Sequence, residues 1–257
     1  MNPRLLFLIV IVCFNVVSKG EKFNFALLTD THISINSPSH SEDLQRAIDE
    51  INATPDIDFV ILDGDITDFG DSASLALARE IINTLHVPWY ITSGNHDTKV
   101  KGTDKIVFKD VFGDDKFLFK HKGLRFIGFN TGPENDKNEG HIYPEDLKWL
   151  KKKLKSGKKH TPDFVFTHYP LLKGDVDNYK DITKLLNKYK VKVVINGHYH
   201  RNVLLNFDNI PGIVCRSTLR GNEENGGYTV FEVSDTSLQV FEKIIGKPLR
   251  EWVMLPL

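Results

Sequence analysis

The alternation of short β-type runs with helical patterns from Phe23 onward constrains the fold of this chain more than any other feature. The runs FNFALLTD and DFVILDGD enclose a helical stretch, SEDLQRAIDEIN, where Ser41 is placed to cap a helix and apolar residues from Leu44 to Ile51 fall at helical spacing. A second helical stretch, SASLALAREIINTL, precedes the strand-like VPWYITSGNHD. This βαβαβ order predicts parallel strands whose sheet is buried under helices.

The remainder of the chain predicts more strands of both kinds. KFLFKHKGLRFIGFNT is typical of a hairpin that turns at Lys122 and Gly123. A helix from Pro144 to about Leu154, a strand DFVFTH, a helix in DITKLLNKYK and a strand VKVVING follow. After His200 we expect four antiparallel strands, VLLNF, GIVCRS, GGYTVFEV and SLQVFEKII, and no helix. The pattern as a whole predicts a two-sheet α/β sandwich in one domain.

The first twenty residues have the features of an export signal. A basic Arg4 precedes an apolar run from Leu5 to Phe14, and the small residues Ser18 and Gly20 are spaced as they are before a signal-peptidase site. Ten apolar residues make about 15 Å of helix, which is short for a bilayer core of about 30 Å. We therefore expect a signal peptide over 1–20, a mature domain over 21–257 without a membrane span, and an exported protein. The alternatives are an uncleaved anchor and a buried N-terminal helix.

Composition and charge exclude several classes of protein. Hydrophobic residues make up 40% and charged residues 26% of the chain, which excludes a disordered or collagen-like protein. With 33 Lys+Arg against 34 Asp+Glu, the formal net charge is −1, so we expect no stable nucleic-acid binding. Removal of the leader, which contains Cys13, would leave Cys215 as the single cysteine, and no disulfide could form within the mature chain.

Polar residues follow five of the predicted strands. In an α/β sheet the carboxyl ends of successive parallel strands meet at one edge, so side chains placed there converge on one crevice. The five clusters are Asp30 and His32, Asp65 and Asp68, Asn95 with His96 and Asp97, His168 alone, and His198 with His200.

This set of side chains predicts a metal site. Aspartates, an asparagine carbonyl and histidines are oxygen and nitrogen ligands, which suit Mn, Fe, Zn or Ni and disfavour a cysteine-rich structural zinc site. Their number exceeds what a single tetrahedral ion can use. Two ions that share a carboxylate, about 3.5–4 Å apart, are the economical interpretation.

The spacing within the clusters carries a further expectation about the backbone. Residues i and i+2, as in the Asp30/His32 and His198/His200 pairs, point the same way while the backbone is extended. The glycines at 64, 94 and 197 are expected to let the chain turn tightly beside the ions.

The ordered motifs DxH, GDxxD, GNHD, a lone His and GHxH resemble those of the calcineurin-like metallophosphoesterases. The resemblance spans roughly Phe23 to His200, and five motifs in one order make it specific at the level of the superfamily. It implies a four-layer αββα sandwich of two mixed β-sheets flanked by helices, with a dinuclear metal centre. Carried over by residue, it implies one metal on Asp30, His32 and His200, the other on Asn95, His168 and His198, and Asp65 between them.

The resemblance also implies the reaction. A metal ion lowers the pKa of bound water from about 15.7 towards about 7, which would supply a hydroxide for in-line attack on a phosphate ester. His96 would then be the general acid or a phosphate-stabilising residue, oriented by Asp68. Asp97 is expected to make a structural hydrogen bond within its turn, with a catalytic role as the alternative.

Departures from related branches narrow the expected substrate. Phe69 stands where protein serine/threonine phosphatases have an arginine, and Asp68 stands where purple acid phosphatases have a metal-binding tyrosine. The motifs are most similar to the branch that includes cyclic-nucleotide phosphodiesterases, so a small phosphodiester is favoured over a phosphoprotein. A broad-specificity phosphomonoesterase remains an alternative. So does a non-catalytic metal-binding scaffold of the same fold, as a retromer subunit of this family resembles.

Several nearby side chains have two interpretations on sequence alone. Tyr169 and Tyr199 adjoin ligand candidates and are expected either to stack on a base or to pack against the core. Arg220 is expected to form a loop salt bridge rather than a phosphate contact, and His141 is the other histidine whose loop could reach the crevice.

Overall fold

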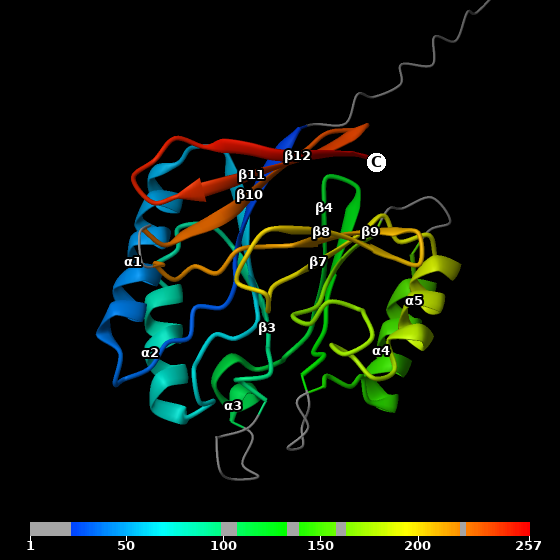
Figure 1. The fold of residues 1–257 in the computed structure, drawn as a ribbon, viewed down its shortest axis with the longest axis horizontal. Helices are drawn as coiled ribbons and strands as arrows, with labels where there is room; N and C mark the ends of the chain where they lie inside the picture. The colour runs from blue at the N-terminus through cyan, green and yellow to red at the C-terminus, as the bar shows by residue number, and fades with distance from the viewer. Residues whose placement is uncertain (1–21, 99–106, 133–138, 158–162, 222–224) are drawn as a thin grey trace, which may run out of the picture.

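Two β-sheets face each other at the centre of the molecule, and helices cover their outer faces (Figure 1). The computed structural model describes residues 22–98, 107–132, 139–157, 163–221 and 225–257. The expected signal peptide, 1–20, lies outside the described residues. Helices α1 and α2 lie on one side of the sheets, and α4 and α5 lie on the other (Figure 1). The four-layer αββα sandwich is thereby confirmed.

The first sheet combines three parallel strands with three antiparallel ones. Its strand order is β12-β11-β10-β1-β2-β3, in which β1, β2 and β3 run parallel. Parallel pairing sets Leu28 beside Leu62, so these strands end at the same level. Their bounds are β1 Phe23–Leu28, β2 Ile57–Asp63, β3 Trp89–Thr92, β10 Gly227–Val233, β11 Ser237–Ile244 and β12 Arg250–Pro256.

The second sheet has parallel strands at its centre and antiparallel strands at its edges. The order is β4-β5-β6-β7-β9-β8, and β5, β6, β7 and β9 run parallel. The β4–β5 hairpin turns at Lys122 and Gly123, as predicted, and both residues have positive φ. The bounds are β4 Phe117–His121, β5 Leu124–Gly128, β6 Asp163–Phe166, β7 Val193–Asn196, β8 Val203–Phe207 and β9 Ile210–Val214.

Five helices occur in the described residues, and none of them is long and apolar enough to cross a membrane. The prediction that Ser41 caps the first helix is wrong. The helix begins a turn earlier, after Ser37, because Pro38 has the fixed φ that suits the first helical position. The bounds are α1 Pro38–Ala53, α2 Ser72–Ile82, α3 Phe108–Phe112, α4 Pro144–Lys155 and α5 Tyr179–Lys188.

Three apolar layers hold the four layers of structure together. The central one lies between the sheets and is rich in phenylalanine, with Phe25 stacked on Phe231 at 4.6 Å and on Phe59 at 5.1 Å between ring centroids. The outer layers pack α1 and α2 on the first sheet, and α4 and α5 on the second. The buried Cys215, just after β9, belongs to the central layer. Packing on both faces keeps the strand ends in fixed relative positions.

The C-terminal part differs from the expected run of four antiparallel strands. β9 pairs parallel with β7 and antiparallel with β8 in the second sheet, whereas β10 and β11 belong to the first sheet. A fifth strand, β12, was missed because its sequence REWVMLP begins with charges and ends at a proline. It lies at the edge of the first sheet, where such residues are tolerated.

Candidate metal centre

The five polar clusters all follow the carboxyl ends of strands, but the strands belong to two sheets. The first three clusters follow β1, β2 and β3, and the last two follow β6 and β7. His168 Nε2 lies 3.1 Å from Asp65 Oδ2, and His200 Nε2 lies 3.2 Å from Asp30 Oδ1, so the clusters meet across the gap between the sheets. The predicted convergence is present, although the expectation of a single sheet edge is wrong.

One group of possible metal ligands consists of Asp30, His32 and His200. Asp30 is fully buried, and its Oδ2 accepts hydrogen bonds from Thr29 Oγ1 at 2.8 Å and from the backbone nitrogen of His198 at 3.1 Å. The Nε2 atoms of His32 and His200 face each other at 3.2 Å. Two ring nitrogens and a carboxylate oxygen that all lie within 4.8 Å of one another form a set that one cation can bridge.

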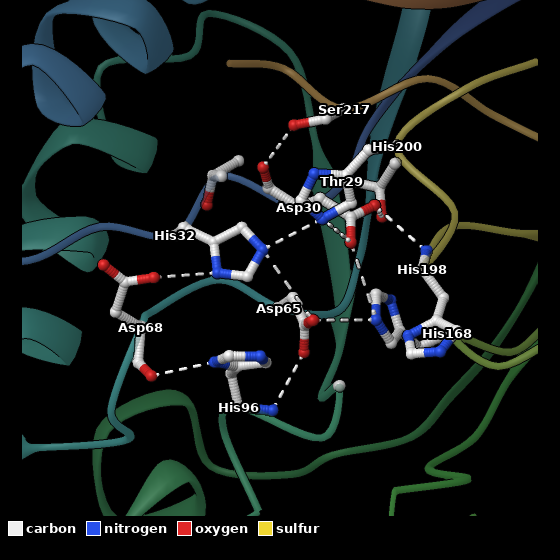
Figure 2. A network of polar contacts seen from close by, with 12 residues as sticks. Thr29, Asp30, His32, Asp65, Asp68, His96, His168, His198, His200 and Ser217 are labelled. Carbon is white, nitrogen blue, oxygen red and sulfur yellow. Dashed lines mark hydrogen bonds and ion pairs between the residues drawn. The ribbon is translucent and has the colours of Figure 1, made fainter.

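A second group consists of Asp65, His168 and His198, and a third combines Asp65 with His32 and His96. Asp65 Oδ2 lies 3.1 Å from His168 Nε2 and 3.9 Å from His32 Nε2, so this carboxylate stands between the first two groups. Figure 2 shows the imidazole rings gathered around Asp30 and Asp65. The arrangement fits two neighbouring ions with Asp65 shared.

Asn95 supplies a separate test of this fit. Its Oδ1 atom is buried and has no hydrogen-bond partner among the described residues. A buried amide oxygen without a partner is costly unless something binds it. A cation would satisfy this atom, and the expected place of Asn95 beside His168 and His198 stays a prediction.

Hydrogen bonds to the main chain fix which ring nitrogen is available. His168 Nδ1 donates to the backbone oxygen of Asp63 at 2.7 Å, which leaves Nε2 for a metal. The oxygen of Asp63 also accepts from Thr29 Oγ1 at 2.8 Å, and Ser217 Oγ donates to the backbone oxygen of Asp30 at 2.8 Å. The sequence gives no signal for these contacts, because a carbonyl oxygen is common to every residue.

The pKa values of the buried Asp and His side chains depend on one another. Burial alone would raise the pKa of Asp65, but the His168 ring, together with the rings of His96 and His32, outweighs burial and holds that pKa well below its usual range. Burial lowers the pKa of His168, yet the carboxylates of Asp65 and Asp30 raise it to about 10. Burial and the positive charge of His168 lower the pKa of His198 to about 4. Without metal, His168 therefore carries the proton that a bound cation would displace.

His96 lies at the open side of the site. Its side chain is exposed, its Nδ1 donates to the backbone oxygen of Asp68 at 2.9 Å, and its backbone nitrogen donates to Asp65 Oδ1 at 2.9 Å. Its ring meets the ring of His32 edge-on at 4.8 Å between centroids. The expected link between His96 and Asp68 is present, and the accepting atom is the carbonyl oxygen of Asp68.

The backbone beside the ligands is not extended, so that expectation is wrong. Positive φ values between 45° and 71° occur at Asp30, His32, Asp65, His198 and His200. Aspartate and histidine adopt this left-handed conformation more readily than most residues. The expected glycine turn holds at Gly64, which has φ 78°. Gly94 and Gly197 instead permit close approach, because a Cβ atom would overlap with Asp65 at Gly94 and with Thr29 at Gly197.

Asp97 has the structural contacts expected of it. Its carboxylate accepts from the backbone nitrogens of Ile66 at 2.9 Å, Thr67 at 2.8 Å and Gly94 at 3.0 Å. It thereby fastens the loop after β3 to the loop after β2, which carries Asp65.

The structure shows the contacts of the four side chains that had two interpretations. Tyr169 is only 2% exposed and packs with the outer core of the second sheet, so the core interpretation holds. Tyr199 is partly exposed and donates to Asp175 Oδ2 at 2.6 Å. His141 Nδ1 lies 2.7 Å from Asp177 Oδ1. Arg220 Nε lies 2.7 Å from Asp43 Oδ1, which is the expected loop salt bridge.

Comparison with known proteins gives the family. Residues 23–202 match the calcineurin-like phosphoesterases. The chain belongs to this family and is a hydrolase of phosphoric esters. A probable glycerophosphodiester phosphodiesterase of Arcobacter nitrofigilis is 31% identical over 68% of this chain and 70% of its own length. A 3′,5′-cyclic-nucleotide phosphodiesterase of Nostoc is 24% identical over 69% and 71%.

Other relatives carry other names. The human serine/threonine-protein phosphatase CPPED1 is 31% identical over 50% of this chain and 46% of its own length. A dimetal phosphatase of Danio rerio has a TM-score of 0.70 with 13% identity, over 91% of this chain and 98% of the other. GAP50 of Plasmodium, described as an anchor in the inner membrane complex, has a TM-score of 0.61 with 14% identity, over 92% and 88%. These two structures match the fold, which by itself does not decide the chemistry.

Proposed function

We propose that this phosphoesterase hydrolyses small phosphodiesters with two bound metal ions. One ion would bind to Asp30, His32 and His200, the other would bind to Asn95, His168 and His198, and Asp65 would be shared by both. The observation that carries the proposal is the position of Asp65 Oδ2, in contact with His168 and 3.9 Å from His32. When bound, the ions, of which Mn, Fe and Zn fit the ligands, would supply positive charge to the phosphoryl oxygens and lower the pKa of bound water.

The protein's own residues would orient the ligands and manage the leaving group. Main-chain bonds hold His168 and His96 by Nδ1, so that Nε2 of each ring is available. His96 is exposed beside Asp65, where its Nε2 can donate a proton to a departing alkoxide. Asp97 holds the loop that carries His96 in register with the loop that carries Asp65.

The surroundings of the site favour a diester over a phosphoprotein. A monoester dianion carries more negative charge than a diester and benefits from additional cationic side chains. The two nearby arginines already have carboxylate partners: Arg216 Nη1 lies 3.6 Å from a carboxylate oxygen of Glu242, and Arg220 is paired with Asp43. Phe69, which follows Asp68, is 37% exposed and offers an apolar contact where an arginine would offer charge. The phosphodiesterase names of two relatives point the same way, whereas the CPPED1 name points to phosphoproteins.

The test compares three substrate classes on one preparation. Residues 21–257 are purified, stripped of metal and reloaded with Mn²⁺ or Zn²⁺, and are then assayed on bis-p-nitrophenyl phosphate, p-nitrophenyl phosphate and a phosphoserine peptide. We expect the highest kcat/KM on the diester and a loss of about 100-fold or more in His96→Ala. His86→Ala, which removes an exposed histidine outside the five clusters, should keep full activity. A higher kcat/KM on the phosphopeptide would refute the diester preference.

The scaffold alternative makes a different prediction. A scaffold would bind metal, or keep the fold, without hydrolysing any of the three substrates. Metal analysis of the purified protein, alongside the activity assay, separates the two functions. Export is a further part of the proposal, and the mass of the protein recovered outside its host cell would show whether residues 1–20 have been removed.

A further inference from the structure

Two different parts of Asp68 contact two histidines of the site. Its carboxylate Oδ1 lies 3.0 Å from His32 Nδ1, whereas its backbone oxygen accepts the 2.9 Å hydrogen bond from His96 Nδ1. Figure 2 shows the carboxylate directed at the His32 ring and the carbonyl directed at the His96 ring. The side chain at position 68 therefore serves a ligand candidate, and the main chain serves the candidate proton donor.

The main chain holds Asp68 in register with His32. The backbone nitrogen of Asp68 donates to the oxygen of Ile33 at 3.2 Å, and Ile33 forms a parallel β-bridge with Thr67. Thr67 in turn donates its backbone N–H and its hydroxyl to the buried carboxylate of Asp97, at 2.8 and 3.0 Å. Because these contacts are made by the main chain of Asp68 and by neighbouring residues, a substitution of the Asp68 side chain leaves the loop anchored.

The contact with Asp68 determines how His32 can bind a cation. The Asp68 carboxylate makes an ion-pair contact with Nδ1, without an aligned hydrogen bond, and its negative charge favours the proton on that nitrogen, which leaves the Nε2 lone pair free. Nε2 then faces His200 Nε2 at 3.2 Å, inside the first ligand group. A carboxylate partner also makes the ring a more basic ligand and fixes its orientation. The carbonyl oxygen of His32 accepts a hydrogen bond from His40 Nδ1 at 2.7 Å, which holds the main chain of this residue, and the same Nδ1 lies 3.9 Å from Asp68 Oδ2.

We propose that Asp68 is a positioning residue for His32, and that its carboxylate sets the affinity of the Asp30–His32–His200 group for its metal ion. His96 keeps its Nδ1 anchor whatever side chain occupies position 68. The inference rests on the proposed two-metal function and assigns Asp68 to metal binding, in place of the orientation of His96.

The experiment measures metal binding in the absence of substrate. Metal-free wild type, Asp68→Ala and Asp68→Asn are titrated with Mn²⁺ against a competing chelator, and the Co²⁺-loaded forms are compared by visible absorption. In Asp68→Ala we expect one of the two ions to bind about 10- to 100-fold more weakly, with a changed Co²⁺ spectrum. The loss should be smaller in Asp68→Asn, whose amide oxygen can occupy the same place beside His32 Nδ1 but lacks the charge.

Asp71→Ala is the matched control. Asp71 is a carboxylate three residues further along the same loop, and it caps α2 through the backbone nitrogens of Ala73 and Ser74. Its loss should lower the melting temperature without changing either metal affinity. A weaker affinity in Asp71→Ala equal to that in Asp68→Ala would show a general effect of the loop and overturn the inference.

The outcomes separate this inference from the proposed function. If wild type binds two ions but hydrolyses no phosphate ester, the function fails and the role of Asp68 can still be measured. If Asp68→Ala binds both ions as tightly as wild type, the inference is overturned even where activity is lost. His96→Ala should bind both ions normally. Asp68→Asn, which keeps the shape of the side chain, provides the answer if the alanine variant does not fold.

Discussion

Replacement of Gly94 by alanine should displace the carboxylate of Asp65. The new Cβ atom would overlap with both the backbone nitrogen and Oδ1 of Asp65, and it would lie 2.8 Å from His168 Cδ2, where an ordinary contact begins at 3.4 Å. A side-chain rotation cannot relieve the overlap with a backbone atom, so the two loops must separate by about 1 Å. A misplacement of about 1 Å at reacting groups costs on the order of 100-fold in rate. Overpacking should also reduce the free energy of unfolding by about 1–3 kcal/mol.

The assay compares Gly94→Ala with Gly221→Ala. A Cβ atom added at position 221 would meet open space, and the backbone there has no left-handed φ, so this variant controls for the added methyl group itself. We measure kcat on bis-p-nitrophenyl phosphate at saturating metal, together with metal affinity and thermal unfolding. The reasoning predicts a fall of about 100-fold in kcat for Gly94→Ala alone. A kcat within about threefold of wild type, with normal metal affinity, would refute it.

Two further predictions concern metal binding and the buried ion pair between β5 and β6. Because the pKa of His168 is raised to about 10, this ring is protonated at neutral pH in the metal-free protein. Metal binding should therefore release a proton, and the metal affinity should rise by up to about tenfold per pH unit between pH 7 and 9. Calorimetry in two buffers of different ionisation enthalpy measures that release, and a zero proton count would contradict the prediction. Asp163→Ala removes the two-pronged partner of the buried Arg125, at 2.5 and 2.6 Å, and should lower the free energy of unfolding by about 3 kcal/mol, or roughly 6–12 °C in Tm. Glu232→Ala, which breaks the exposed pair with Lys22, should cost under about 1 kcal/mol, and equal losses in the two variants would argue against the role of burial.

The sequence was sufficient to predict the fold class and the meeting of the polar clusters. Strand and helix periodicity identified β1 to β3 and the helices between them, and parallel strands place their carboxyl ends at one level. Asp65 and His168 are about 100 residues apart in the chain, yet each follows a buried strand that ends beside the other sheet. Their 3.1 Å contact also requires that the two sheets face each other, which the strand pattern alone did not specify.

Features that depend on backbone atoms could not be predicted. The oxygens of Asp63 and Asp68 orient His168 and His96, and a carbonyl oxygen leaves no signature in the sequence. The left-handed conformation of the ligand positions is similarly invisible, because aspartate and histidine are also common in extended backbone. The edge strand β12 was missed for a different reason, since its charges and proline resemble those of a loop.

The position of the site between the two sheets has a consequence for durability. Ions held jointly by Asp30 and Asp65 on one side and by His168, His198 and His200 on the other would bind the halves of the sandwich to each other. A link that closes a loop of about 100 residues restricts the unfolded chain by roughly 4–5 kcal/mol, as a disulfide does. The described part of this chain contains one cysteine, Cys215, which is free and buried. Resistance to proteases and heat should therefore depend on how much metal the surroundings supply.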